Sequence, residues 1–320
     1  MNTFTQNLVF SLNATVPIFL LMVLGTFFRK VGLLDEHSVK KLNQFVFRAL
    51  LPALLFKDLA SADFREIWDT KFVLFCFCAT LCCIVIAILF SLLHKSKTER
   101  GEIVQASYRS SAAVLGMAFV NNIYNTSTMA ALMIIGTVPL YNVVAVTILS
   151  ITSPDNDEKQ SKKALFIKTV KEVLTNPIIL GIVVGLLWSI FKIPQPEIFS
   201  KTVSYLSNMA TPLSLIALGA SFKLHDVKGN TLISFGIAAL KLAIFCAIFL
   251  PVSIWLGFRN EKLISILVML GSATTGSCFV MAKNFGHKGI ITACTVMLTT
   301  LLSAFTLTIW LFILKTLEYI

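Results

Sequence analysis

Two clusters of small hydroxyl residues around glycines, one of them next to an arginine, are the parts of this 320-residue chain best suited to chemistry. Arg109 precedes Gly116, and a similar cluster surrounds Gly276. If a membrane helix breaks at such a glycine, hydroxyl groups can pair with the freed backbone, and the half-helix N-terminus attracts an anion. The alternative is close packing of small residues between helices. The hydroxyl residues are Ser107, Ser110, Ser111, Ser272, Thr274, Thr275 and Ser277.

Arg109 is the charged residue whose position in the sequence is most unusual. It lies inside an apolar stretch, a few residues before Gly116. An arginine at the centre of an isolated membrane helix costs at least about 2.5 kcal/mol, so it needs a partner or a water-filled pocket. One interpretation is a positive group that binds an organic anion. The other is a structural arginine that pairs with carbonyl groups or extends to the membrane surface.

Polar residues in neighbouring apolar stretches are further candidates for substrate contact. Asn121, Asn122 and Asn142 lie just past the first glycine or in the following stretch, which favours them for this role. Pro52 and Pro212 each remove a backbone hydrogen bond and predict kinks in their helices. A last group could face a substrate but is individually more typical of hydrogen bonds between packed helices: Asn43, Gln44, Asn208, Thr211 and Ser214.

Four other charged residues fall in apolar stretches. Arg48, Lys57 and Lys241 are expected to have structural roles, and Lys57 and Asp58 lie towards the end of their stretch, within easy reach of the membrane surface. Asp58 is the only acidic residue inside any predicted span. A sodium/proton antiporter normally binds its ion with buried carboxylates at the membrane centre. The sequence therefore argues against cation exchange and leaves proton coupling without an obvious carrier.

The residue patterns of enzyme active sites and metal centres are missing from the sequence. It has no nucleophile–base pair, metal-ligand spacing or phosphate-binding glycine loop. The seven cysteines lie in apolar stretches without CxxC spacing, and the four histidines fall in short polar connections. We therefore expect no enzymatic activity, no metal and no cofactor.

Composition predicts an all-α integral membrane protein. Hydrophobic residues make up 56% of the chain and charged residues 13%, against about 25% charged in ordinary globular proteins. The first apolar run has no preceding basic residue and is too long for a signal peptide, so we expect it to be retained. Ten stretches approach the roughly 20 residues needed to cross a bilayer. They are residues 8–28, 42–62, 72–93, 104–124, 128–151, 174–191, 202–222, 231–256, 263–283 and 289–314.

Helix-breaking residues recur in the chain at one fixed offset of 160 residues, half its length. Such a period indicates two copies of one unit, here five spans each. Because five is odd, the second copy must be inverted in the membrane, and inverted repeats are typical of secondary transporters. The recurring pairs are Pro17 and Pro177, Gly25 and Gly185, Pro52 and Pro212, Gly116 and Gly276, and Phe119 and Phe279.

The formal net charge of +11 is explained by orientation in the membrane. The connections on one side contain 16 Lys and Arg residues and those on the other contain 7. The richer side is expected to be cytoplasmic, with both termini outside. The basic excess then predicts no nucleic-acid partner. The polar linker, residues 152–173, would lie on the cytoplasmic side and end in an amphipathic helix on the membrane surface.

Several motifs resemble the auxin efflux carrier family, which includes plant PIN proteins and bacterial malate or malonate permeases. The segments are TNPIILGIVVGLLWSIFKIPQPEIF, SNMATPLSLIALGASF, PLYNVVAV and AKNFG, and the similarity covers nearly the whole chain. Asn43, Phe45, Val46 and Pro52 also occupy positions of a PIN motif. One feature departs from the family: its members usually carry a proline at the helix breaks, whereas here Gly116, and Gly271 with Gly276, would have to serve.

The resemblance implies ten transmembrane helices in two inverted five-helix repeats, with broken fourth and ninth helices that cross. It divides the chain into residues 1–151, the linker 152–173 and residues 174–320. Spans 1, 2, 6 and 7 would form a scaffold that dimerises with a second copy. Spans 3–5 and 8–10 would form a mobile transport domain.

The sequence thus favours a secondary transporter of a small organic anion, such as malate, malonate or an auxin-like carboxylate, in the plasma membrane. Two alternatives stay open. One is a sodium-coupled symporter of the bile-acid-symporter type, which sodium dependence of uptake would identify. The other is a membrane receptor that kept the fold and lost transport.

Overall fold

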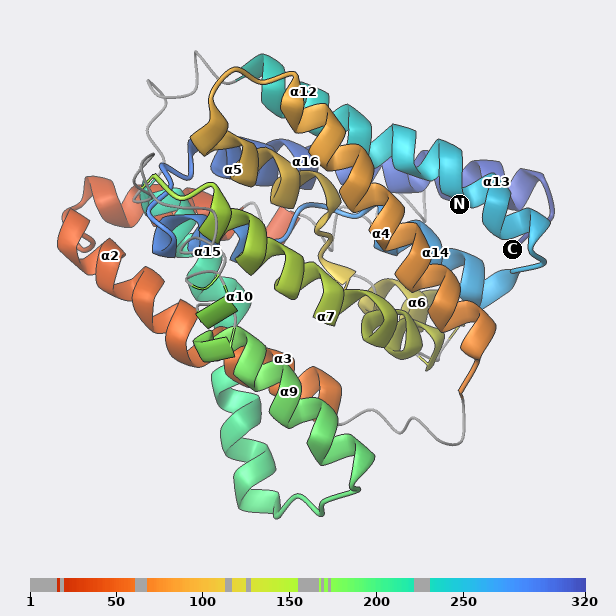
Figure 1. The fold of residues 1–320 in the computed structure, drawn as a ribbon, viewed down its shortest axis with the longest axis horizontal. Coiled ribbons are helices and arrows are strands. Elements are labelled where there is room, and N and C mark those ends of the chain that lie inside the picture. The colour runs from red at the N-terminus through yellow and green to blue at the C-terminus, as the bar shows by residue number, and fades with distance from the viewer. Residues whose placement is uncertain are drawn as a thin grey trace.

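The computed structural model is a helical bundle in the residues that it describes, which are 16–17, 20–60, 68–112, 117–124, 128–154, 167, 170–171, 174–221 and 231–320 (Figure 1). A helix over residues 20–30 precedes the labelled elements. These are α2 (Glu36–Phe45), η1 (Val46–Leu50), α3 (Leu51–Ala60), α4 (Thr70–Leu92), α5 (Lys97–Tyr108), α6 (Met117–Tyr124), α7 (Thr128–Ile151), α9 (Pro177–Ile190), α10 (Glu197–Ser221), α12 (Thr231–Ala239), η3 (Leu240–Ile244), α13 (Phe245–Trp255), α14 (Asn260–Gly271), α15 (Ser277–Asn284) and α16 (Ile290–Thr316).

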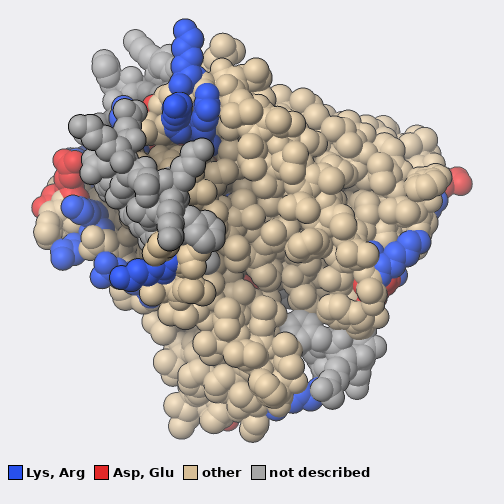
Figure 2. Space-filling view, in the orientation of Figure 1, with Lys and Arg blue, Asp and Glu red and all other residues tan. Residues whose placement is uncertain are grey.

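The distribution of charge on the surface fits a protein that crosses a membrane. Helices α4, α7 and α16, and the continuous run α12–η3–α13, are each long and apolar enough to span. Figure 2 shows a broad uncharged area, with Lys and Arg gathered mainly at the end near α2 and α15. The predicted integral membrane class is therefore supported by the shape and surface of the described residues.

Two of the long helices contain a π-helical turn. The first, η1, lies between α2 and α3, and the second, η3, lies between α12 and α13. An inserted π turn shifts the helical phase and leaves backbone groups to be paired elsewhere. In η3 the carbonyl oxygen of Leu242 accepts a hydrogen bond of 3.0 Å from Nε1 of Trp310 on α16. This bond ties the interrupted helix to its neighbour.

Glycines bring the helices at residues 20–30, α3, α9 and α10 into backbone contact. A methyl group on Gly25 would overlap the carbonyl oxygen of Ile216 on α10, and one on Gly185 would lie 3.0 Å from that of Phe56 on α3. Gly185 follows Gly25, and Ile216 follows Phe56, by the same 160 residues. In the first contact a glycine of the first half meets α10 of the second half, and in the second contact the equivalent glycine of the second half meets α3 of the first half. This reciprocal arrangement is what a two-fold axis between two copies would require. The complete ten-helix inverted repeat stays a prediction.

The N-terminus of α16 is capped by a buried carboxylate from another helix. Glu102 on α5 accepts hydrogen bonds from the backbone N–H groups of Gly289 and Thr292, and from the Thr292 hydroxyl. His287 lies beside this cap, with its two ring nitrogens 2.9 and 3.0 Å from the carbonyl oxygens of Thr98 and Leu149. Together these contacts hold α5, α7 and the α15–α16 turn as one unit.

Two further sequence expectations concern the central linker and the predicted proline kinks. The linker 152–173 lies mostly outside the described residues. Of the predicted kinks, Pro52 is the second residue of α3, directly after the π-helical turn, and Pro212 lies inside the single helix α10.

Candidate functional site

Two interrupted helices meet in the middle of the bundle. Helix α5 ends at Tyr108 and α6 begins at Met117, while α14 ends at Gly271 and α15 begins at Ser277. The linkers between these half-helices run antiparallel to each other, with an isolated β-bridge between Ser110 and Thr274. Breaks therefore occur in both windows where the sequence predicts them, although neither window contains a proline.

Hydrogen bonds to the linkers explain why a proline is not needed for the breaks. The backbone N–H of Ser111 donates to the carbonyl oxygen of Ala273 at 3.0 Å, and that of Thr274 donates to Oγ1 of Thr299 at 3.0 Å. The Thr274 hydroxyl in turn donates to the carbonyl oxygen of Ala106 at 2.8 Å. Because the apolar interior offers no water, these partners compensate for the lost helical bonds. Gly271 ends α14 and Gly276 caps α15 as expected, whereas Gly116 lies outside the described residues.

Arg109 is the first residue of one linker and is buried, with 4% of its surface exposed. Its Nη2 donates to Oδ1 of Asn142 at 3.0 Å and to Oγ of Ser277 at 3.1 Å. Its Nη1 lies near Oε1 of Gln105 and the sulfur of Met281, and its Nε has no hydrogen-bond partner among the described residues. Every one of these acceptors is neutral, so the guanidinium charge is not balanced by its protein contacts.

Lys241 is a second buried cation at the same crossing. It belongs to η3, has no exposed surface, and donates from Nζ to the hydroxyl of Ser110 at 2.8 Å. That hydroxyl donates onward to the carbonyl oxygen of Met269, near the end of α14. Neither Lys241 nor Arg109 takes part in an ion pair within the described part of the chain. The crossing therefore contains two basic side chains that, among the described residues, have no carboxylate side chain as an ion-pair partner.

A cavity of about 60 Å³ lies between the crossing and helices α3, α7 and α10. Its lining includes an arginine, an amide, several hydroxyl groups and one carboxyl group, and the N-terminal end of α15 borders it. The arginine, amide and hydroxyl donors suit the oxygens of an anion. The lining residues are Leu51, Leu54, Leu55, Asp58, Arg109, Ser110, Ser111, Ala112, Val138, Tyr141, Asn142, Thr211, Ser214, Thr275, Gly276 and Ser277.

The predicted site residues divide into those at this cavity and those elsewhere. Nine of them line it: Arg109, Ser110, Ser111, Asn142, Thr211, Ser214, Thr275, Gly276 and Ser277. Ser272 and Thr274 are buried in the linker pairing, and Asn208 is exposed on α10. Asn43 lines a different cavity. Asn121 and Asn122 lie in α6, but their side chains are outside what the structure describes.

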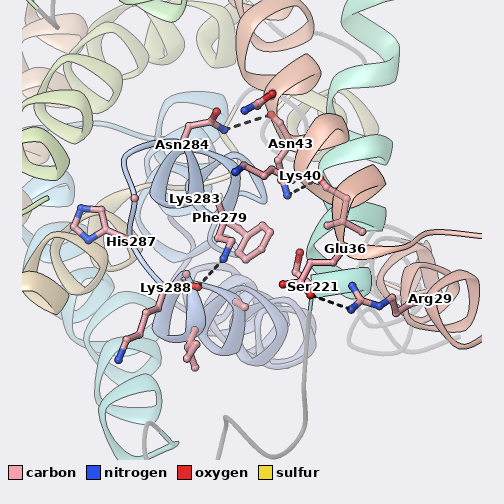
Figure 3. A pocket seen from close by; sticks show the side chains of 16 residues that line it. Arg29, Glu36, Lys40, Asn43, Ser221, Phe279, Lys283, Asn284, His287 and Lys288 are labelled. Atoms are coloured by element: carbon pink, nitrogen blue, oxygen red, sulfur yellow. Dashed lines mark hydrogen bonds and ion pairs between the residues drawn. The ribbon is translucent and has the colours of Figure 1, made fainter. Parts of the chain in front are cut away.

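A larger cavity of about 630 Å³ lies between α2 and the α15–α16 turn (Figure 3). Its lining includes four basic side chains and one carboxylate, which are Arg29, Lys40, Lys283, Lys288 and Glu36. Glu36 and Arg29 approach to 3.9 Å, and Nζ of Lys283 donates to the carbonyl oxygen of Lys288. All of these residues belong to connections on the side that the charge count predicts to be cytoplasmic. We refer to this basic cavity as the vestibule.

The structure corrects the sequence interpretation of Asp58. The sequence suggested a carboxylate that reaches the membrane surface, but Asp58 lines the same cavity as Arg109, and its Oδ2 is buried without a hydrogen-bond partner in the described residues. A signal in the sequence could have indicated this. Asp58 continues a stripe with Leu51, Leu54 and Leu55, at the spacing of one helical face. Tyr141, next to Asn142, is a further lining residue that the sequence analysis did not select.

Comparison with known proteins places the chain in a family. A family model described as "Membrane transport protein" matches residues 10–311. An "Uncharacterized transporter" from Methanothermobacter thermautotrophicus is 24% identical, covering 94% of this chain and 97% of its own. A protein from Rhizobium meliloti named "Putative malonate transporter" is 23% identical, covering 94% of each chain.

A solved structure shares the fold at much lower sequence similarity. It is a sodium proton antiporter from Methanocaldococcus jannaschii, with a TM-score of 0.60 and 12% identity. The match covers 94% of this chain and 97% of the other. At this identity the likeness concerns the arrangement of helices alone.

Proposed function

Because the chain belongs to the membrane transport protein family, which contains the auxin efflux carriers, we propose that it is a secondary transporter of a small organic anion. The observation that carries this proposal is the unbalanced charge of Arg109 at the crossing cavity. Among the residues that the structure describes, its Nε has no hydrogen-bond partner and its other nitrogens contact only neutral acceptors. A carboxylate would supply the missing negative charge and accept charge-assisted hydrogen bonds.

The chemistry around Arg109 favours a compact carboxylate. Nη2 of Arg109 donates to Ser277 and Asn142, and Ser111 and Thr275 also line the cavity. The Rhizobium meliloti relative named as a malonate transporter makes a dicarboxylate the leading choice. The present cavity of about 60 Å³ has room for about two waters, so binding such an acid would accompany a small separation of α3 from the crossing.

Alternating access would use the vestibule as one of two entrances. The vestibule opens between α2 and the α15–α16 turn, and its basic residues raise the local concentration of anions. Spans 1, 2, 6 and 7 would form the fixed scaffold, and spans 3–5 with 8–10 would move against it. Under this proposal the two repeats are residues 1–151 and 174–320, joined by the linker 152–173. Both termini would lie outside the plasma membrane.

A homodimer through the scaffold is part of the same proposal. Helices α9 and α10 extend beyond the rest of the bundle in Figure 1. Large apolar side chains on them are exposed, including Leu180, Val184, Leu187 and Tyr205. A second copy packed against this surface would hold the scaffold still while the transport domain moves.

Uptake by purified protein in liposomes tests the proposal. A panel of labelled carboxylates, including malonate, malate and an indole acid, would be measured by counterflow against the same unlabelled compound inside. We expect at least one carboxylate to exchange, independently of sodium. Exchange that requires sodium would support a sodium-coupled symporter instead, and binding of a carboxylate without exchange would support a receptor.

A further inference from the structure

Asp58 is a half-buried residue that lines the candidate substrate cavity from the side opposite the crossing. It lies on α3, whereas Arg109 lies on the linker after α5, and both line the cavity of about 60 Å³. Oδ2 of Asp58 is buried and has no hydrogen-bond partner among the described residues. By contrast, the buried carboxylate of Glu102 receives three hydrogen bonds. The two acids therefore differ in what their surroundings provide for a negative charge.

Within the described part of the chain, no charged group on the elements packed against Asp58 forms an ion pair with it. Lys57, its neighbour on α3, donates to Oδ1 of Asn208 on α10. Helix α9 contains no charged residue, and the charges of α10, Glu197 and Lys201, pair with each other at its exposed end. Arg109 shares the cavity, but no ion pair joins it to Asp58 in the described residues.

An unpaired buried carboxylate is expensive when it is ionised. The penalty for burying a charge without a partner amounts to several kcal/mol, which a bound proton removes. An anion that arrives at Arg109 would add a second negative charge close to Asp58. The arrangement therefore favours protonation of Asp58 whenever the anion is bound.

We propose that Asp58 carries a proton together with the substrate anion, which makes the protein a proton–anion symporter. This inference rests on the proposed function and adds its coupling. On the side where the cavity opens, Asp58 takes a proton from water as the anion binds to Arg109. After the transport domain has moved, the anion leaves and water reaches Asp58, which releases the proton on the other side. One proton crosses with each anion, and binding of either one strengthens binding of the other.

The geometry also explains why this coupling is compatible with the fold. Asp58 belongs to the proposed scaffold and Arg109 to the proposed transport domain, so the two groups separate and approach as the cavity opens and closes. A proton site at the boundary between the two bodies is exposed to water only in the open states. Asp58 therefore binds and releases its proton at the same stages at which the anion enters and leaves.

The test measures substrate and proton movement in the same liposomes. Malonate, or the panel carboxylate with the fastest counterflow, is applied outside liposomes that contain a pH-sensitive dye. For the wild type we expect counterflow and acidification of the interior. Asp58→Asn has no acidic proton at this position, so we expect the number of protons taken up per carboxylate transported to fall towards zero, whatever rate of counterflow the variant keeps. Glu197→Gln removes an exposed carboxylate from α10 and should behave as wild type.

A second measurement uses the wild type alone and does not depend on the folding of a variant. Titration calorimetry of carboxylate binding in buffers of different ionisation enthalpy counts the protons taken up, and we expect net uptake. The absence of proton uptake, or acidification that persists in Asp58→Asn, would overturn the coupling while leaving transport in place. A wild type that exchanges no carboxylate would overturn the proposed function itself, and the coupling with it.

Discussion

The crossing has two sides, and each holds one buried cation in a different setting. Arg109 faces the cavity, and in the described part of the chain it contacts only neutral acceptors and has no partner for Nε. Lys241 is fully enclosed, is not part of the cavity lining, and donates to the Ser110 hydroxyl inside the linker. The same charge thus serves two purposes. Under the proposed function, Arg109 is available to the ligand, whereas Lys241 offsets the negative C-terminal ends of α5 and α14.

Replacing Arg109 is the strongest way to break this comparison. We expect Arg109→Gln to weaken carboxylate binding by about 2–5 kcal/mol, because the anion loses its charged partner in a buried site. Titration calorimetry and counterflow would measure the loss. Arg259→Gln removes an equal charge at the far end of α13, where the guanidinium contacts backbone carbonyls and the Tyr319 ring, and serves as the control. Equal effects of the two substitutions would contradict a binding role for Arg109.

Replacing Lys241 should affect carboxylate affinity less than replacing Arg109 does, and should not lower the stability of the protein. Lys241→Met keeps the length of the side chain and removes a buried charge that has no ion-pair partner among the described residues. Removing the charge relieves a desolvation penalty of several kcal/mol, which offsets the loss of the hydrogen bond to Ser110 and of the interaction with the helix ends. We expect an unchanged or higher melting temperature in detergent and a smaller loss of carboxylate affinity than for Arg109→Gln. An affinity loss as large as that of Arg109→Gln would place Lys241 in the binding site.

Gly271 and Gly276, the two glycines of the second break, also differ in whether they face the enclosed side of the crossing or the cavity. A methyl group on Gly271 would lie 2.7 Å from Sγ of Cys246, whereas one on Gly276, which lines the cavity, would lie 3.1 Å from Cδ2 of Leu215. Gly271→Ala should therefore lower stability by about 1–3 kcal/mol. Gly276→Ala should affect mainly binding.

Thermal unfolding and counterflow of both variants measure these effects. Adding Cys246→Ala to Gly271→Ala removes the overlapping sulfur and should restore part of the stability. If the double variant is no more stable than Gly271→Ala, the close contact with Cys246 is not the cause of the loss.

The smallest expected effect concerns the ion pair between α14 and the beginning of α4. Lys262 on α14 pairs with Asp69, the N-cap of α4, and this hydrogen bond holds the pKa of the Asp69 carboxyl below its usual value. The folded state thus prefers the ionised acid. Its contribution is present near neutral pH and is lost as the pH falls below about 4.

The pair is partly exposed, so we expect it to contribute no more than about 1 kcal/mol. Asp69→Asn should lower the melting temperature slightly at pH 7 and by less at pH 3, while Glu197→Gln provides the control. A difference between Asp69→Asn and wild type that grows as the pH falls would contradict this assignment.

The sequence anticipated the backbone of the crossing better than the side chains around it. Gly271, Gly276 and the flanking hydroxyl residues predict a break because they favour an interrupted helix at any position in lipid. The family resemblance is confirmed by the match to residues 10–311. These features depend on local composition and on the order of residues, which a single sequence displays directly.

What the sequence did not reveal depends on the direction in which side chains point. Lys241 lies in a π-helical turn, which shifts the helical phase and defeats the usual assignment of faces by periodicity. Asp58 is near the end of its span, so its position along the helix suggested the membrane surface. Its position around the helix instead directs it to the cavity, on the same face as Leu51, Leu54 and Leu55. Glu102 precedes its predicted span by two residues and is nevertheless buried, because it caps a helix from the other half of the chain.

The pairing of the two linkers also constrains how the protein is made. The backbone N–H of Ser111 receives its partner from Ala273, which lies 162 residues later in the chain. At about 5–20 residues per second, a ribosome needs about 8–30 seconds to add that length. For this time the first break has no permanent partner, and the newly inserted half must hold exposed peptide groups in the bilayer or in the insertion machinery. Neither half of the chain can complete its own membrane fold, so the two halves must mature as one.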